Sequence, residues 1–345
     1  MRIVTICVLL TCGFVAWAQQ KDGVSVLADK QITSAKDGFC TPGIINQSRA
    51  RGLEVTYNLS GGGYWEHGDD TAEQFVGQMQ SLESMNVKLR VPVLLKPDLK
   101  ILVGYQYQPQ RYSFREIGAP IQPFVGEVNN QPLKSNAFSL YLTKSFDEKY
   151  YSAFRVRMGF NGAYDGWVNF DDQYMTFNVI GLFGIKKSDH FEWGVGAVFS
   201  RNIRRTLLLP FMMLNKNFND KWGLETAPPA YILGRYNVNP RTILLFGGEY
   251  NSSIFSIEPN SINAFQANDN LVYSINNRSF NVVINLERQI IPWLWLDVKG
   301  GFQFNLNSRF EVQIPDTDNV LRFQPPNAPF LQVGIFLSPP DELMQ

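Results

Sequence analysis

Apolar side chains recur at every second position in many segments of this chain, and this period constrains the fold more than any other feature. In one segment Leu53, Val55, Tyr57 and Leu59 alternate with polar residues. Successive side chains of a β-strand point to opposite faces, whereas a helical face repeats about every 3.6 residues. Similar segments continue to the end of the chain. The sequence therefore predicts an all-β protein whose strands each have one apolar face.

The segment 207–251 indicates how the strands are connected. It contains two copies of a pattern in which an apolar stretch near a proline leads into an Asn-rich turn, a basic residue and another apolar stretch. The copies align Asn217 with Asn237 and Asn219 with Asn239. Because Asn tolerates left-handed backbone and closes tight turns, each copy predicts a β-hairpin with a short connection.

The first 18 residues have the features of a secretory signal peptide. Arg2 precedes an apolar stretch over 3–15, and Ala16-Trp17-Ala18 supplies small residues before a cleavage site. This stretch is shorter than the roughly 20 residues that a spanning helix needs. We therefore divide the chain into a signal peptide (1–18), a polar periplasmic lead-in (19–49), the β-structure (50–338) and a C-terminal tail (339–345).

Composition narrows the class of protein. Charged residues make up 18% of the chain, below the norm of about 25%, and aromatic residues make up 14%. The 31 basic and 31 acidic residues balance, so nothing indicates nucleic-acid binding. An exported chain of alternating strands fits a barrel in the bacterial outer membrane, which must be closed because lipid cannot satisfy a sheet edge. The alternative is a soluble β-sandwich with an aromatic core.

Short turns alternate with longer loops, as expected of a closed antiparallel up-and-down transmembrane β-barrel. Residues 222–237 lie between two similar turns, so they must run up and back, with Pro228-Pro229 as the reversal. This reading predicts 14 strands; if the piece is a kinked insert, the number is 12. The predicted long loops are Gly61–Gln80, Arg115–Pro132, Glu258–Arg278 and Asn305–Asn327.

Aromatic residues gather near the predicted strand ends, where lipid headgroups would lie. Those beside the short turns are Tyr150, Tyr151, Phe191, Trp193, Trp222, Trp293 and Trp295; those near the opposite ends are Tyr105, Tyr107, Phe160, Phe199, Tyr250, Phe302 and Phe304. Two such belts are expected of a barrel in a bilayer.

The turns NFNDKWGLE (217–225) and RYNVNPRT (235–242) resemble an outer-membrane β-barrel family of unknown function from Bacteroidetes-type Gram-negative bacteria. The resemblance covers most of the mature chain. It implies the barrel fold and an outer-membrane location, but no activity. Outer-membrane barrels commonly end on an aromatic residue that the barrel-insertion machinery reads. Phe336 fits that pattern, but residues 338–345 follow it.

Charged residues on the predicted inner face separate by sign along the chain. The first half contributes Lys88, Arg90, Lys100, Arg155, Arg157 and Lys186; the second half contributes Glu192, Glu225, Glu249, Glu287 and Asp297, with Arg235 and Lys299 as exceptions. Opposed charges across a water-filled lumen would screen solutes by charge. The alternative is that neighbouring charges pair and fill a closed interior.

Candidates for metal binding and catalysis are few. Glu66, His67, Asp69 and Asp70 could form a metal site in one loop, although acidic loop clusters are usually only solvated. Neither of the two histidines lies in the middle of a strand, so a Ser-His catalytic arrangement facing lipid is not expected. We expect no cofactor and no enzymatic activity.

Two functional hypotheses follow. The first is a passive outer-membrane channel or transporter for a small solute. The second is a structural or docking component of an outer-membrane assembly such as a secretion machine. Either protein would have lipid and the barrel-insertion machinery as partners, and the first also a small solute.

Overall fold

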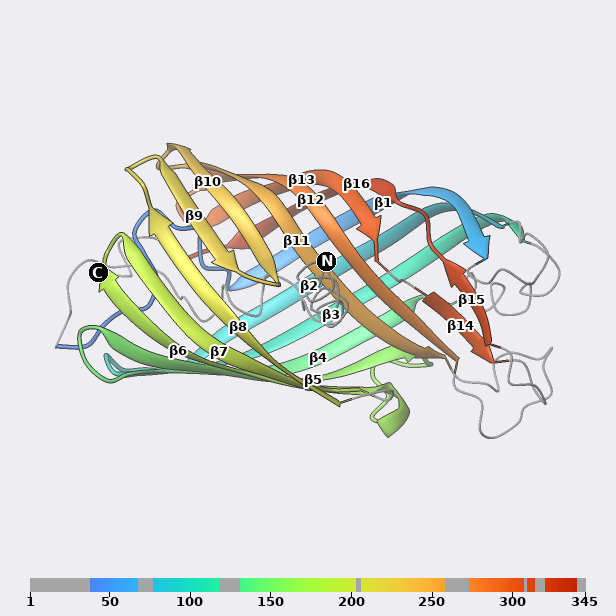
Figure 1. Ribbon diagram of the computed structural model, residues 1–345, viewed down its shortest axis with the longest axis horizontal. Helices are drawn as coiled ribbons and strands as arrows, with labels where there is room; N and C mark the ends of the chain where they lie inside the picture. The colour runs from blue at the N-terminus through green and yellow to red at the C-terminus, as the bar shows by residue number, and fades with distance from the viewer. Residues whose placement is uncertain are drawn as a thin grey trace, which may run out of the picture.

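The strands predicted from the two-residue period close on themselves into a barrel (Figure 1). The computed structural model describes residues 38–67, 77–117, 131–202, 206–257, 273–306, 309–313 and 320–339. Within these residues, fourteen antiparallel strands form the ring, as predicted. Neighbouring strands of the ring are hydrogen-bonded to each other. The last strand closes the ring, because it pairs on one side with the preceding strand of the ring and on the other side with the first strand.

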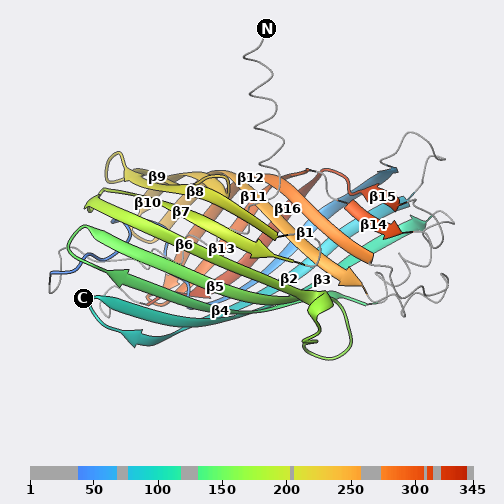
Figure 2. The same ribbon diagram turned by 60° about the horizontal axis from the view of Figure 1, so that its bottom comes forward.

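The fourteen strands follow the order of the chain. Figure 2 shows that they are tilted against the long axis of the barrel, as closure of a sheet requires. They are β1 (Leu53–His67), β2 (Gly77–Leu95), β3 (Leu99–Ile117), β4 (Leu133–Ser145), β5 (Tyr150–Ala163), β6 (Met175–Ser188), β7 (Phe191–Arg201), β8 (Thr206–Asn217), β9 (Trp222–Ala227), β10 (Tyr231–Asn239), β11 (Thr242–Ile257), β12 (Tyr273–Ile291), β13 (Leu294–Asn305) and β16 (Ala328–Leu337). A 3-10 turn, η2 (Asp172–Tyr174), precedes β6.

Two further strands lie beyond the ring. β14 (Arg309–Gln313) and β15 (Val320–Gln324) form a hairpin that pairs with the ends of β12 and β1. The predicted loop Asn305–Asn327 is therefore partly strand. The predicted loops Gly61–Gln80 and Glu258–Arg278 are also too long, because β1, β2 and β12 extend into them. A strand end without an apolar outer face shows no alternation of apolar and polar residues, so the period does not reveal it.

The connections between β2 and β3, β4 and β5, β6 and β7, β8 and β9, β10 and β11, and β12 and β13 are short and lie at one end of the barrel, which we call the turn end; the opposite end is the loop end. Asx side chains close the turns as predicted: Asp147 accepts hydrogen bonds from the backbone N–H groups of Lys149 and Tyr150, and Asn219 does the same for Lys221 and Trp222. Backbone hydrogen bonds also join each turn to the next around the rim. The rim is therefore a continuous hydrogen-bonded structure.

The hairpin of β9 and β10 is the shortest in the ring, with six and nine residues. It reverses at Pro228-Pro229, which confirms fourteen strands rather than twelve. The described pairing of β8 with β9 covers only Leu214–Asn217. At the loop end β11 instead pairs in parallel with β5, at Gly162 and Ala163. The barrel wall is thus lower on the β8–β10 side than elsewhere.

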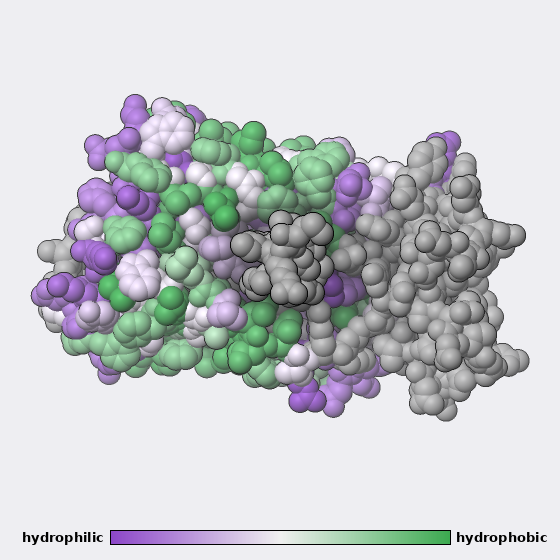
Figure 3. Space-filling model, viewed as in Figure 1, coloured by the Kyte–Doolittle hydropathy of each residue, from purple (hydrophilic) through white to green (hydrophobic). Residues whose placement is uncertain are grey.

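The two faces of the wall differ as predicted. On β2, Met85, Leu89 and Val91 are exposed on the outer face, whereas Asn86 and Lys88 between them are buried on the inner face. Figure 3 shows apolar residues along the middle of the wall and hydrophilic residues at the turn end. No helix among the described residues is both long and apolar enough to span a bilayer.

Two aromatic residues assigned to the lipid belts face inward instead. Tyr151 is 0% exposed and Trp295 is 1% exposed, and Trp295 stacks on Phe336 with ring centroids 6.0 Å apart. Each is flanked along the strand by outward residues, so strand alternation places it on the inner face. Tyr150 and Tyr151 are adjacent in the sequence, but Tyr150 is exposed on the outer face and Tyr151 is buried on the inner face.

Residues 38–52 lie in the turn end of the barrel rather than outside it. The backbone N–H of Cys40 donates to Asp147 O at 2.7 Å, and that of Ile45 donates to Asp189 O at 2.9 Å. The backbone N–H of Gly52 donates to Leu337 O at 2.8 Å, immediately before β1. This stretch, which we call the mouth segment, includes residues that the sequence assigned to a periplasmic lead-in. Its contacts are with the inner face and the rim.

Candidate functional site

The interior of the barrel is divided into two regions of opposite character. Where β5 to β10 face inward, side chains pack into a buried apolar cluster, the apolar core. Its members are Cys40, Tyr151, Ala153, Ile180, Leu182, Phe211, Met213, Ala227, Tyr231, Leu233, Val283 and Phe330. Apart from Cys40 of the mouth segment, Val283 and Phe330, all of these residues lie on strands between β5 and β10. This part of the lumen is filled.

The other region is a cavity of about 760 Å³, the polar chamber. Its walls are β1, β2, β3, β11, β12, β13 and β16, together with residues 47–52 of the mouth segment. Among the described residues, none of the lining comes from β4 to β10. The lining runs from Lys96 and Pro97 at the turn end to Tyr112 and Asn305 near the loop end. The chamber therefore passes beside the mouth segment.

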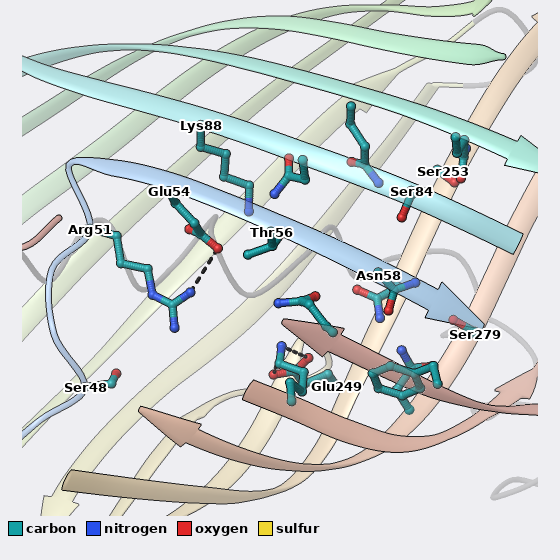
Figure 4. Close-up of a pocket in the computed structure, with 18 of the residues that line it drawn as sticks. Ser48, Arg51, Glu54, Thr56, Asn58, Ser84, Lys88, Glu249, Ser253 and Ser279 are labelled. Carbon is teal, nitrogen blue, oxygen red and sulfur yellow. Dashed lines mark hydrogen bonds and ion pairs between the residues drawn. The ribbon is translucent and has the colours of Figure 1, made fainter. Parts of the chain in front are cut away.

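The lining is mostly hydrogen-bonding side chains. Figure 4 shows Thr56, Asn58, Ser84, Ser253 and Ser279 directed toward the same space from β1, β2, β11 and β12. Charged groups concentrate toward the turn end. The lining includes seven basic residues, Arg49, Arg51, Lys88, Arg90, Lys96, Lys100 and Lys299, and three acidic residues, Glu54, Glu249 and Glu287.

Arg51 of the mouth segment lies among carboxylates at the turn end of the chamber, which we call the chamber floor. Its guanidinium contacts Glu54 at 2.9 Å, Glu287 at 2.6 Å and Asp297 at 3.0 Å, and it lies 4.4 Å from the ring centroid of Phe336. Burial lowers the pKa of Arg51, but Asp297, Glu54 and Glu287 raise that pKa well above its ordinary value. Arg51 therefore stays charged and joins β1, β12 and β13 through their carboxylates.

Two further carboxylates are bound by the backbone of the mouth segment. Glu192 is 0% exposed and accepts from Gly43 N at 2.8 Å. Glu225 accepts from Ser48 N at 2.9 Å and from Ser48 Oγ at 2.7 Å. It also forms a fully buried ion pair with Arg235 at 2.8 Å. These bonds explain why a polar, aperiodic segment is ordered inside the barrel.

The structure places the other predicted lumen residues as follows. Lys299 pairs with Glu249 at 3.0 Å across β13 and β11. The guanidinium of Arg90 donates to Arg51 O at 3.0 Å, and that of Arg157 donates to Gln106 Oε1 at 3.2 Å. Arg155 lies 5.3 Å from the ring centroid of Tyr141, whereas Lys88 and Lys100 line the chamber. Lys186 pairs with Asp189 at 3.0 Å at the turn end.

The two sequence hypotheses for these charges each describe part of the lumen. Apart from Arg235 and Lys299, the predicted basic residues lie on β2, β3, β5 and β6, and the predicted acidic residues lie on β7, β9, β11, β12 and β13. However, the acidic residues have close partners: the mouth segment contacts Glu192, Glu225, Glu287 and Asp297, and Lys299 contacts Glu249. They do not simply face the basic residues across open space.

Sequence reasoning missed the mouth segment as part of the site. Arg49, Arg51 and Ser48 have no strand period around them, so nothing local predicts where they lie. One signal was present: two arginines stand directly before β1 in a chain whose later strands place five acidic residues inward. A buried carboxylate requires a partner, and these arginines were available for that role.

The candidate metal ligands of the first long loop fall outside the part of the chain whose side chains are described. Asp69 and Asp70 lie outside the described residues, as do the side chains of Glu66 and His67. Within the described part of the chain, no three His, Cys, Asp or Glu side chains are grouped so as to hold a metal ion.

Several solved structures are similar to this chain at low identity. An outer membrane channel from Pseudomonas putida F1 is 10% identical, with 89% of this chain and 100% of that chain covered and a TM-score of 0.40. A Pseudomonas aeruginosa FadL homologue is 10% identical, with 93% and 96% covered and a TM-score of 0.44. The TodX monoaromatic hydrocarbon channel, as a deletion mutant, is 7% identical, with 84% and 91% covered and a TM-score of 0.41.

No curated protein matches the chain. The family model described as Domain of unknown function (DUF6268) matches residues 71–315, well over half of the sequence, and the chain therefore belongs to that family.

Proposed function

We propose that this protein is a passive outer-membrane channel for a small hydrophilic solute. The observation that carries the proposal is the polar chamber, which extends beside the mouth segment from the turn end toward the loop end. Its volume of about 760 Å³ lies within the range of roughly 300–1,000 Å³ typical of small-molecule sites. Its lining of hydroxyl, amide and charged groups suits a hydrated solute rather than a hydrocarbon.

The outer face supports the membrane location. Exposed apolar side chains on nearly every strand of the ring, such as Leu89, Leu140 and Ile284, would be costly in water. A closed ring with no free edge along most of its height suits a lipid environment. In this proposal lipid surrounds the wall, the turn end faces the periplasm, and the signal peptide directs export.

Single-channel recording in planar bilayers tests the proposal. The purified, folded barrel should produce discrete conductance steps, and Ser84→Trp should reduce them, because the indole would enter the chamber from β2. Ser188→Trp is the matched control, since that serine is exposed at the turn end outside the chamber. A wild-type barrel that inserts but never conducts would exclude a channel.

A second candidate function is a docking component of an outer-membrane assembly. The observation that favours it is the group of apolar side chains exposed at the turn end, including Phe146, Phe218 and Trp293. In this candidate function, these residues contact a periplasmic partner. This candidate predicts a folded, membrane-inserted barrel without conductance, so the same recording separates the two functions.

The orientation in the membrane is tested by labelling. In a Cys40→Ser background, single cysteines replacing Pro97, Asp147, Asn219 or Asn239 should be inaccessible to an impermeant maleimide added to intact cells. Cysteines in the long loops should be labelled. Surface labelling at any of the four turn positions would reverse the proposed orientation.

A further inference from the structure

We infer that the mouth segment makes the channel selective for small anions, because it covers the acidic part of the lumen and leaves a predominantly basic chamber. The inference rests on the proposed channel function and adds its substrate class. In this inference, residues 38–52 determine which ions permeate, in addition to covering part of the turn end.

The mouth segment covers two acidic residues of the wall. Glu192 and Glu225 come from β7 and β9, and neither lines the chamber. The mouth segment lies over both, through Gly43 N on Glu192 and through Ser48 N and Oγ on Glu225. Both carboxylates are almost fully buried, at 0% and 1% exposed. A solute in the chamber is therefore shielded from these two charges.

The mouth segment also places arginines against the carboxylates on the chamber floor. Arg51 contacts Glu54, Glu287 and Asp297 at once, within 2.6–3.0 Å. Arg49 adds a second cation beside this group and lies 5.2 Å from the ring centroid of Trp295. The segment thus contributes two positive charges where the wall strands contribute carboxylates. Figure 4 shows Arg51 directed toward Glu54 on the chamber floor.

The wall formed by β2 and β3 contributes only basic charges to the chamber. β2, β3 and the turn between them contribute Lys88, Arg90, Lys96 and Lys100 to the lining and no carboxylate. In the whole lining, the seven basic residues outnumber the three acidic ones. In a narrow lumen bounded by protein and lipid, such an excess attracts anions and repels cations. The contributions of the two arginines from the mouth segment are part of this excess.

An alternative is that these charges serve only to hold the mouth segment in place. Stability alone would be satisfied by any arrangement in which each carboxylate has a partner, whatever the net charge left in the chamber. The two explanations differ in what they predict for ion permeability, so selectivity is the deciding measurement.

The experiment measures the reversal potential of the full-length folded protein in planar bilayers under a KCl gradient. The expected result is a reversal potential of the sign given by chloride permeating faster than potassium. Arg51→Gln should move the reversal potential toward potassium permeability, and Arg51→Lys should restore most of the wild-type value. Lys149→Gln, on an exposed turn residue outside the chamber, should leave it unchanged.

If Arg51→Gln does not fold, the pair Lys88→Gln and Lys100→Gln tests the same idea from the opposite wall and should also move selectivity toward potassium. Folding of each variant is checked by the heat-modifiable band of the intact barrel on gels. A conducting wild type that prefers potassium, or variants that fold with unchanged selectivity, would overturn the inference while the channel function stands. A folded wild type with no conductance would overturn the channel function itself.

Discussion

The polar chamber and the apolar core occupy the same lumen, and both are built from inward-facing positions of the same sheet. On β1 to β3 and β11 to β13 those positions are mainly Ser, Thr, Asn, Gln and charged residues. On β6 to β10 they include Ile180, Leu182, Phe211, Met213 and Leu233. An inward position in a barrel can therefore belong either to an open polar chamber or to a packed interior.

The difference between these regions shows how a barrel of intermediate size can be partly closed. Around eight strands can be filled by side chains alone, whereas 16–18 strands leave an open channel. Here the apolar core fills one side of a fourteen-strand ring, and the mouth segment closes the turn end over it. The remaining space is the polar chamber, which is narrower than the ring, so in the proposed channel its lining residues determine which solutes pass.

The largest effect should come from breaking the ion pair on the core side. Glu225→Ala leaves Arg235, which is 0% exposed, without its carboxylate, and losing one partner of a buried pair costs about 3–5 kcal/mol. Glu249→Ala on the chamber side should cost less, because Lys299 is 13% exposed and can be hydrated. Urea unfolding of the detergent-refolded barrels measures both. Equal losses would show that the chamber is as dry as the core.

Two Leu→Ala variants, one in the apolar core and one on the chamber wall, extend the comparison of the two regions. Leu233→Ala in the apolar core should lower the free energy of unfolding by about 2–5 kcal/mol, because the packed site cannot fully collapse. Leu102→Ala on the chamber wall should cost clearly less, since one side of that leucine already borders the cavity. Urea titrations of both proteins give the difference. A larger loss for Leu102→Ala would contradict the division of the lumen.

The outer face provides the next contrast. Leu89→Arg should destabilise the inserted barrel by roughly 2–4 kcal/mol if this outward position lies near the middle of the bilayer. Lys88→Leu, one position away on the inner face, should have a much smaller effect on insertion. The fraction of the heat-modifiable folded band reports both. Similar losses for the two variants would show that the assignment of faces on β2 is wrong.

The smallest effect concerns thiol reactivity. Cys40 is buried in the apolar core, and burial raises the pKa of its thiol, so little reactive thiolate is present at neutral pH. It should react slowly with a water-soluble maleimide, and faster as the pH rises toward that higher pKa. Ser84→Cys in a Cys40→Ser background should react quickly in the chamber. Rapid labelling of Cys40 in the folded protein would indicate that the mouth segment opens.

Local pattern in the sequence was enough for the architecture. The alternation on β2 assigns Leu89 to the outer face and Lys88 to the inner face, because successive strand residues must point opposite ways. The Asn219 turn and the Pro228-Pro229 reversal follow from local backbone preferences, and together they favoured fourteen strands over twelve, which the pairing of β9 with β10 then confirmed. These features depend on residues within a few positions of one another, which is why they can be predicted from one chain.

Only the tertiary structure decided what each inner face meets. The strand period indicates that Glu192 and Asp297 point inward, but not that Gly43 and Arg51 lie against them, 149 and 246 residues away in the chain. It likewise could not separate the chamber from the core, because both use the same inward positions. Such contacts depend on closure of the ring and on the path of an aperiodic segment through it, and no local preference encodes either one.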